Sequence, residues 1–339
     1  MQRQVTNSTL NVYKLASTSA TAARRLDATR RHFSGSSSRM QAVNNMTVFG
    51  GGLMGAGIAQ VASQHGIKVT LCDLTDQALA TSKTMMQKSL SRIANKKHPD
   101  SKDEQQAYIS SVFDNVTLTT DPALAVKDAD LVIEAIVENI KVKKELFRML
   151  DEECSAKTIF ASNTSSLSIS EIASATSQAR RAKFGGVHFF NPVPQMKLVE
   201  VIRTEETSDE TFQSLLDVCK RMQKHAVSCK DTPGFIVNRL LVPYMFESVR
   251  MLERGDATAE DIDAAMKLGA GYPMGPFELI DFVGLDTAQH ILDGWRQKVE
   301  SGQADSLSSD LVAPSALLSQ KVKEGKLGRK SGEGFYKYN

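Results

Sequence analysis

The chain has 339 residues, a length that suggests about two domains of ordinary size. Its content of 41% hydrophobic and 24% charged residues is typical of globular proteins and argues against global disorder or a fibrous repeat. The formal net charge is only +2, which argues against a nucleic-acid-binding protein, and no apolar run is long enough to predict a membrane span.

The basic residues are concentrated near the N-terminus. Residues 1–33 hold six arginines and lysines but a single acid, Asp27, and the first 45 residues are rich in serine and threonine. Few acids with many arginines and hydroxyl groups are typical of an organellar transit peptide. We therefore predict that residues 1–44 are a mitochondrial transit peptide and linker, with cleavage expected after Phe33, and that the protein functions in the mitochondrial matrix. The alternative is a disordered basic tail.

A glycine-rich turn follows the first predicted strand, residues 47–49. The turn is Gly50-Gly51-Gly52-Leu53-Met54-Gly55, a helix begins next, and a second strand at residues 68–73 ends in Asp73. This order predicts a dinucleotide site, because the glycines permit a tight turn and close approach of a pyrophosphate to the helix N-terminus. Asp73 is expected to bind the ribose hydroxyls. No arginine follows it, which favours NAD over NADP.

Two further apolar strands, residues 130–136 and 158–162, are predicted in the same domain. Glu138 and Lys143 follow the first strand and Ser165 follows the second, where doubly wound sheets bind ligands. Helix capping is the alternative role for such residues. A long helical stretch over residues 75–113 carries several lysines and arginines, which form either a solvated face or a clamp for a phosphorylated substrate.

Two further apolar strands are predicted: residues 186–190, in which His188 is the single titratable residue, and residues 197–202, in which Glu200 is the single acid. Two prolines between the strands predict a turn, and antiparallel pairing in one register places His188 opposite Glu200. A carboxylate that fixes the imidazole tautomer makes the histidine suitable as a general base. The alternative is a core histidine with a purely structural role.

Strand signals stop after Lys230, and four helices are predicted over residues 235–254, 258–270, 276–299 and 314–324. We therefore predict an α/β Rossmann-type domain over residues 45–230 and an all-helical domain over residues 231–339. Apolar residues of the first of these helices are expected in the core or in a dimer interface, and we predict a homodimer through the helical domain. No pair of cysteines has a spacing typical of a metal site, and no metal site is predicted.

From about residue 45 to the end, the sequence resembles the 3-hydroxyacyl-CoA dehydrogenase family. The resemblance rests on the segments 50–60, 160–167, 188–194, 230–239, 266–279 and 332–338. It implies an NAD-dependent enzyme of fatty acid β-oxidation that oxidises (S)-3-hydroxyacyl-CoA to 3-oxoacyl-CoA. Two alternatives remain at this point: a 3-hydroxybutyryl-CoA dehydrogenase working in the reductive direction, and a non-enzymatic NAD-binding protein of the same fold.

The resemblance also implies roles for individual residues. His188 and Glu200 match the catalytic pair, and Asn238 matches an amide near the reacting oxygen. Ser165 matches a hydroxyl that contacts both cofactor and substrate. The remaining matches are the NAD fingerprint at Gly50, Gly51, Gly52, Leu53, Met54 and Gly55 with Asp73, further NAD contacts at Glu138, Lys143, Asn191 and Lys330, and coenzyme A contacts at Ser89 and Lys96. Acyl-chain length, oligomer size and regulatory partners are not predicted.

Overall fold

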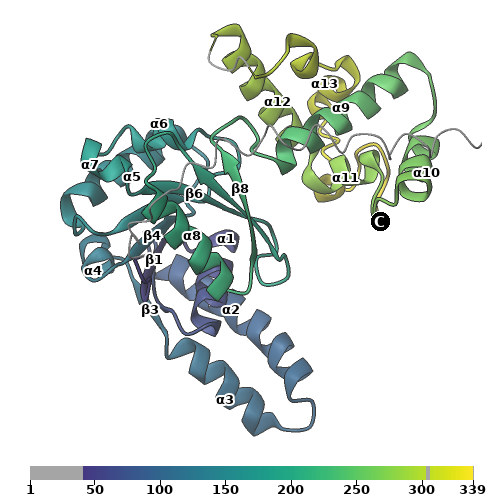
Figure 1. Cartoon of the computed structure of the whole chain (residues 1–339). Coiled ribbons are helices and arrows are strands. Elements are labelled where there is room, and N and C mark those ends of the chain that lie inside the picture. Colours follow the sequence, from purple (N-terminus) through teal and green to yellow (C-terminus); the bar gives the residue numbers. More distant parts are fainter. Residues whose placement is uncertain (1–40, 303–305, 339) are drawn as a thin grey trace, which may run out of the picture. The chain divides into compact units, whose positions relative to one another are not determined.

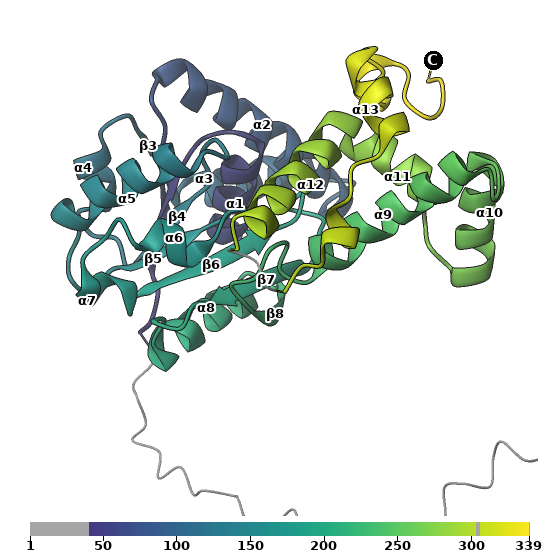
Figure 2. The same cartoon turned by 90° about the horizontal axis from the view of Figure 1, so that it is seen from above.

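The computed structural model describes residues 41–302 and 306–338. Residues 1–40 of the predicted transit peptide and linker lie outside the described residues. The described chain begins with a doubly wound α/β domain and continues into a helical domain (Figures 1 and 2). The predicted fold class is therefore confirmed. None of the described helices combines the length and hydropathy needed to cross a membrane.

The first domain is built on an eight-stranded sheet with the order β3-β2-β1-β4-β5-β6-β7-β8. Strands β1 to β6 are parallel, β7 is antiparallel to β6, and β8 is parallel to β7. The strand order reverses between β1 and β4, and ligands of such sheets bind at this point. The strands are β1 (Asn45–Phe49), β2 (Lys68–Cys72), β3 (Val116–Thr119), β4 (Leu131–Glu134), β5 (Ile159–Ser162), β6 (Phe184–Phe189), β7 (Leu198–Arg203) and β8 (His225–Lys230).

Helices cover both faces of this sheet because successive strand residues point to opposite faces. Val48 of β1 lies in one apolar core, together with residues of α1, α2 and α8, whereas the adjacent Phe49 lies in a second core with residues of α4, α5 and α6. The covering helices are α1 (Leu53–Gln64), α2 (Asp76–Lys97), α4 (Pro122–Val126), α5 (Ile140–Glu153), α6 (Ile169–Ala173), α7 (Gln178–Arg181) and α8 (Asp209–Arg221).

The helical stretch predicted over residues 75–113 is two helices, α2 and α3 (Lys102–Phe113), which form a hairpin (Figure 1). The helix breaks at His98-Pro99-Asp100-Ser101, since proline removes a backbone donor and Ser101 caps α3 by accepting a hydrogen bond from the amide of Glu104. Leu90, Ala94, Ile109 and Val112 form the small buried core between the two helices.

The second domain is helical and packs around buried Trp295. The helix predicted over residues 276–299 is interrupted at Gly284, whose φ of 101° is incompatible with a continuous right-handed helix. The elements of the second domain are α9 (Val237–Arg254), α10 (Ala259–Ala270), α11 (Pro276–Val283), α12 (Leu285–Glu300), the short 3₁₀ helix η1 (Ser309–Val312), α13 (Ala316–Lys323) and the 3₁₀ helix η2 (Arg329–Ser331).

The chain enters the helical domain through two consecutive residues in the left-handed region. Gly234 has a φ of 79° and Phe235 a φ of 50°. This conformation delays the start of α9 to Val237, two residues later than the apolar pattern predicts. It also turns the backbone amides of Ile236 and Val237 toward β7, where they donate to Glu200.

Candidate active site

The glycine-rich turn lies between β1 and α1 and is held by the end of β2. The amide of Gly50 donates to the carbonyl of Cys72 at 2.8 Å, and the amide of Gly51 donates to Asp73 Oδ2 at 2.5 Å. A Cβ atom built on Gly52 would meet no described atom within 4 Å, which leaves open space beside the N-terminus of α1. No side chain of the described residues caps this helix. The turn therefore fits the pyrophosphate of a dinucleotide.

His188 on β6 lies directly opposite Glu200 on β7, so the predicted register is confirmed. The distance from His188 Nδ1 to Glu200 Oε2 is 2.7 Å, and His188 Nε2 lies 3.1 Å from Ser165 Oγ. The rings of Phe190 and Phe235 flank the imidazole, with centroids 4.5 Å and 5.7 Å away. His188 is 4% exposed and Glu200 is fully buried, so the pair lies in a site that is largely screened from water.

Glu200 uses its second oxygen at the start of the helical domain. Its Oε1 accepts from the amide of Ile236 at 3.0 Å and from the amide of Val237 at 2.8 Å. Burial raises the pKa of Glu200, but the hydrogen bonds from His188 and from these two amides outweigh burial and hold the pKa below its ordinary value. An ionised Glu200 therefore orients the imidazole and also caps the N-terminus of α9.

Ser165 is presented to His188 by the loop that follows β5. Asn238, in the first turn of α9, donates from Nδ2 to the carbonyl of Ser165 at 3.3 Å. His188, Glu200, Ser165 and Asn238 were predicted as catalytic residues, and the structure brings all four together. They come from β6, β7, the loop after β5 and α9.

Glu138 organises the loop that carries Ser165. Its Oε1 accepts from the amide of Ser165 at 2.9 Å, from the amide and hydroxyl of Ser166, and from the Thr164 hydroxyl at 2.6 Å. Burial raises the pKa of Glu138, but the ammonium of Lys143 and these hydrogen bonds outweigh burial and lower the pKa below its ordinary value. The structure thus gives Glu138 a contact with the Ser165 loop beside its predicted contact with NAD.

Lys143, which was also predicted as an NAD contact, is only 1% exposed. Its ammonium lies 2.6 Å from Glu134 Oε1 and 3.1 Å from Glu138 Oε2. Glu134 ends β4, is fully buried, and accepts from the Ser162 hydroxyl at 2.6 Å. Glu134 and Ser162 were not predicted as site residues. The signal was present for Glu134, because it is an acid within an apolar strand, the same pattern that identified Glu200.

The other predicted ligand contacts are not among the hydrogen-bond partners of His188 and Glu200. Ser89 and Lys96 lie on α2, which has Lys88, Arg92 and Lys96 exposed at helical spacing. Asn191 is exposed just beyond β6. Lys330 pairs with Asp286 of α12 at 2.5 Å, and its only ion pair in the described chain is this one. No cluster of metal-ligating side chains occurs within residues 41–302 and 306–338.

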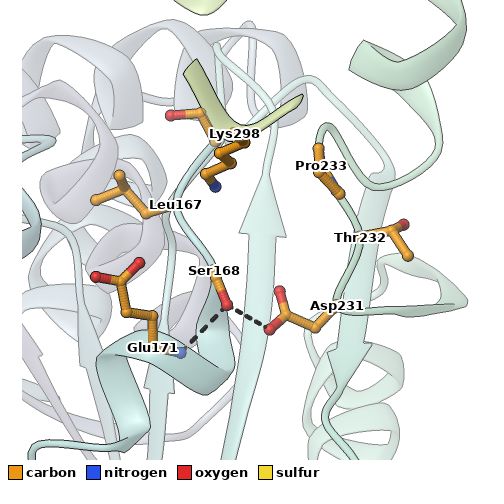
Figure 3. Close-up of a pocket in the computed structure, with 8 residues that line it drawn as sticks. Leu167, Ser168, Glu171, Asp231, Thr232, Pro233 and Lys298 are labelled. Atoms are coloured by element: carbon orange, nitrogen blue, oxygen red, sulfur yellow. Dashed lines mark hydrogen bonds between the residues drawn. The ribbon is translucent and has the colours of Figure 1, made fainter. Parts of the chain in front are cut away.

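A pocket of about 430 Å³ opens beside the Ser165 loop (Figure 3). Asp231 lines one side of the pocket. Its carboxylate accepts from the Ser168 hydroxyl at 2.8 Å and from the amides of Ile169 and Ser170. Asp231 thereby ties the strand end after β8 to the N-terminus of α6. Glu171 and Lys298 also line the pocket, which places charges of both signs within it.

Two protein families of known sequence pattern match the chain. Residues 45–232 match the family described as "3-hydroxyacyl-CoA dehydrogenase, NAD binding domain". Residues 234–338 match the one described as "3-hydroxyacyl-CoA dehydrogenase, C-terminal domain". The two matches together account for nearly all of the described chain.

Individual relatives agree with these matches. The chain is 55% identical to a protein of Rattus norvegicus named "Hydroxyacyl-coenzyme A dehydrogenase, mitochondrial", over 87% of this chain and 91% of that protein. It is 44% identical to a "Probable 3-hydroxybutyryl-CoA dehydrogenase" of Deinococcus radiodurans, over 86% and 99%. Among solved structures, the (S)-3-hydroxybutyryl-CoA dehydrogenase of Ralstonia eutropha aligns with a TM-score of 0.80 at 36% identity, covering 88% of this chain and all of that one. The chain therefore belongs to the 3-hydroxyacyl-CoA dehydrogenase family, which is a family of NAD-dependent oxidoreductases.

Proposed function

We propose that His188 is the general base in the reaction (S)-3-hydroxyacyl-CoA + NAD⁺ → 3-oxoacyl-CoA + NADH + H⁺, with Glu200 as its orienting partner. The observation that carries this proposal is the position of His188, between Glu200 at 2.7 Å and Ser165 at 3.1 Å, at the ligand-binding edge of a Rossmann sheet. The reaction is the one expected of the family to which the chain belongs.

The roles of the two imidazole nitrogens follow from the hydrogen bonds. An ionised Glu200 can only accept, so Nδ1 of His188 donates to it and Nε2 of the neutral ring carries the lone pair, which faces the Ser165 hydroxyl at 3.1 Å. That lone pair can take the proton of the substrate 3-hydroxyl, and Glu200 then stabilises the imidazolium that forms. In the reverse direction the same nitrogen returns the proton to the ketone oxygen. Ser165 and Asn238 are placed to hydrogen-bond the reacting oxygen or the thioester.

NAD, when bound, supplies the hydride acceptor. The pyrophosphate is expected on the turn from Gly50 to Gly55 and the ribose on Asp73, whose negative charge would repel the 2′-phosphate of NADP. Glu138 and Asn191 flank the same edge of the sheet. Ser89 and Lys96 of α2 are the expected contacts of coenzyme A, and the neighbouring Lys88 and Arg92 supply further positive charge to its phosphates.

A substitution of His188 tests the proposed chemistry directly. In His188→Gln the side chain keeps hydrogen-bonding capacity but loses the base, so we expect turnover to fall by about 10²–10⁴-fold. NADH binding, which depends on the fingerprint, should remain close to that of the wild type. The measurement is the decay of absorbance at 340 nm with acetoacetyl-CoA and NADH, together with NADH titration by fluorescence. Wild-type turnover in the variant would refute the assignment.

The two alternative functions are separated by the same assay. A non-enzymatic NAD-binding protein would bind NADH but show no decay with acetoacetyl-CoA. An enzyme committed to 3-hydroxybutyryl-CoA would lose kcat/KM steeply beyond the four-carbon substrate in a series from C4 to C16. The chain resembles both relatives named hydroxyacyl-coenzyme A dehydrogenases and relatives named 3-hydroxybutyryl-CoA dehydrogenases, so the substrate series decides between these two functions.

Two further proposals concern location and assembly. The relatives that share 55% identity are named mitochondrial, which supports a mitochondrial location, and we place the protein in the matrix together with acyl-CoA oxidation.

We also propose a homodimer through the helical domain. A groove of about 580 Å³, lined almost entirely by apolar atoms, runs between α9 and α10. Exposed Leu240, Leu268 and Tyr272 lie on the same helices or just beyond them, and the buried Tyr244 hydroxyl has no partner among the described residues.

A further inference from the structure

We infer that Glu134 is a positioning residue, which fixes the loop carrying Ser165 and thereby sets the contact between Ser165 and His188. The inference rests on the proposed roles of His188 and Ser165 and adds to them a residue that does not touch the reacting groups. Glu134 lies at the end of β4, is fully buried and uses both carboxylate oxygens within the site.

The first arm of this arrangement runs through the lysine. Glu134 Oε1 holds the ammonium of Lys143 at 2.6 Å, and the same ammonium lies 3.1 Å from Glu138 Oε2. The other oxygen of Glu138 receives the hydrogen bonds of the loop, including the amide of Ser165 at 2.9 Å. Because Lys143 is 1% exposed, its charge must be balanced locally, and the two neighbouring carboxylates fix its position.

The second arm runs through a hydroxyl. Ser162 donates to Glu134 Oε2 at 2.6 Å, and the Ser162 oxygen accepts from the amide of Thr164 at 3.2 Å. Both arms therefore end on the segment from Thr164 to Ser166, one at its first amide and one at its centre. The amide of Ile136 also donates to Glu134 Oε1 at 2.7 Å, which fixes the carboxylate relative to the strand end.

This geometry distinguishes a positioning role from ordinary structural stabilisation. The Arg180–Asp151 ion pair offers a matched comparison, since it is also largely buried, has an N–O distance of 2.8 Å and involves α5, the helix that carries Lys143. Its contacts are with the carbonyls of Cys154, Ser155 and Thr158 and with the amide of Ser177, none of which belongs to the Ser165 loop. Loss of that pair should affect stability alone.

The decisive experiment is a double-mutant cycle between Glu134→Gln and Ser165→Ala, measured as kcat with acetoacetyl-CoA and NADH. Misplacing Ser165 should lower kcat by about 10- to 100-fold in Glu134→Gln. In the Ser165→Ala background, the same substitution should change kcat by less than about twofold, because the group that it positions is gone. The Asp151→Asn control should lower the melting temperature and leave kcat unchanged in both backgrounds.

Each outcome decides the question. Equal effects of Glu134→Gln in both backgrounds would show a structural role and overturn the inference. A lowered kcat for Ser165→Ala beside a wild-type kcat for Glu134→Gln would overturn this inference alone, whereas a wild-type kcat for Ser165→Ala would overturn the proposed role of Ser165 as well. If Glu134→Gln does not fold, Ser162→Ala cuts only the hydroxyl arm, and a wild-type kcat in that variant would also overturn the inference.

Discussion

Glu200 makes its hydrogen bonds in two directions, to the imidazole of His188 and to the first amides of α9. One carboxylate thus connects the proposed base with the start of the helical domain. Replacement by glutamine keeps an acceptor for the amides but offers an N–H to His188 Nδ1. The ring would then carry its proton on Nε2, and this nitrogen could no longer accept one.

We therefore expect Glu200→Gln to lower kcat by about 10³–10⁴-fold, as a reversed tautomer does in other His–carboxylate pairs. The same substitution should also change the stability of the protein in a way that depends on pH. The pKa of Glu200 in the fold lies below its ordinary value of 4.5, so its contribution to stability is present above about pH 4.5 and is lost as the pH falls through the lower value.

The check is chemical denaturation of wild type and variant at several pH values. The difference in free energy of unfolding should be largest near neutral pH and should shrink below pH 4.5. A difference that does not depend on pH would contradict the ionised, hydrogen-bonded state assigned to Glu200.

At the same scale, the sequence predicted the residues whose signal is local. His188 and Glu200 stood out as titratable groups in apolar strands, and their pairing followed from strand register alone. Glu134 carries an equivalent signal, but its importance depends on Lys143, Glu138 and Ser162, which the fold brings together from separate segments. The ion pair between Lys330 and Asp286 could not be predicted, because it depends on a turn of the chain that residue spacing does not specify.

Two glycines of the nucleotide turn serve different purposes, one in folding and the other in ligand binding. A Cβ built on Gly55 would lie 1.8 Å from the carbonyl oxygen of Gly50, so the glycine permits the close packing of α1 on the turn. A Cβ on Gly52 would meet nothing within 4 Å of the described chain, and its φ of −65° suits alanine. The two glycines should therefore respond differently to the same substitution.

Gly52→Ala should fold normally or gain about 0.4–1 kcal/mol, because alanine restricts the unfolded chain, yet it should raise KM for NAD by placing a methyl group where the pyrophosphate approaches. Gly55→Ala should destabilise the protein by about 1–3 kcal/mol through overpacking. Melting temperature and NAD titration of the two variants provide the measurement. Tight NAD binding by Gly52→Ala would show that the pyrophosphate lies elsewhere.

Elements were predicted well where a strand or helix has a strong period and poorly where a single residue interrupts it. The apolar period continues across Gly284, and only the backbone angle there divides α11 from α12. Strands β3 and β8 were not predicted. Neither is a continuous apolar run, and in the structure both strands are only partly buried. The central strands lie between two helical layers and are apolar throughout, which is why their pattern was clear.

At the scale of the whole molecule, the helical domain exposes large apolar side chains on α9 and α10 that lie outside its buried core. Leu268 is 88% and Leu240 70% exposed, while Tyr244 and Tyr272 stack with ring centroids 5.3 Å apart beside the apolar groove. Contiguous exposed apolar surface marks interaction sites. In a twofold symmetric dimer each residue of the interface is buried twice, so a charge placed there acts at two positions.

Leu268→Glu and Leu240→Glu should each weaken self-association by about 100-fold or more, since burial of one leucine contributes about 1.5–3 kcal/mol and two copies are affected. The matched control is Leu124→Glu on α4, which replaces a leucine that is 61% exposed in the first domain and should leave association unchanged. Sedimentation velocity would show the wild type near twice the chain mass of 37.1 kDa and the two interface variants near that mass. A wild type that sediments as a monomer, or a control that dissociates as readily as the interface variants, would show that this face does not pair with a second copy, and the apolar groove between α9 and α10 would then need another occupant.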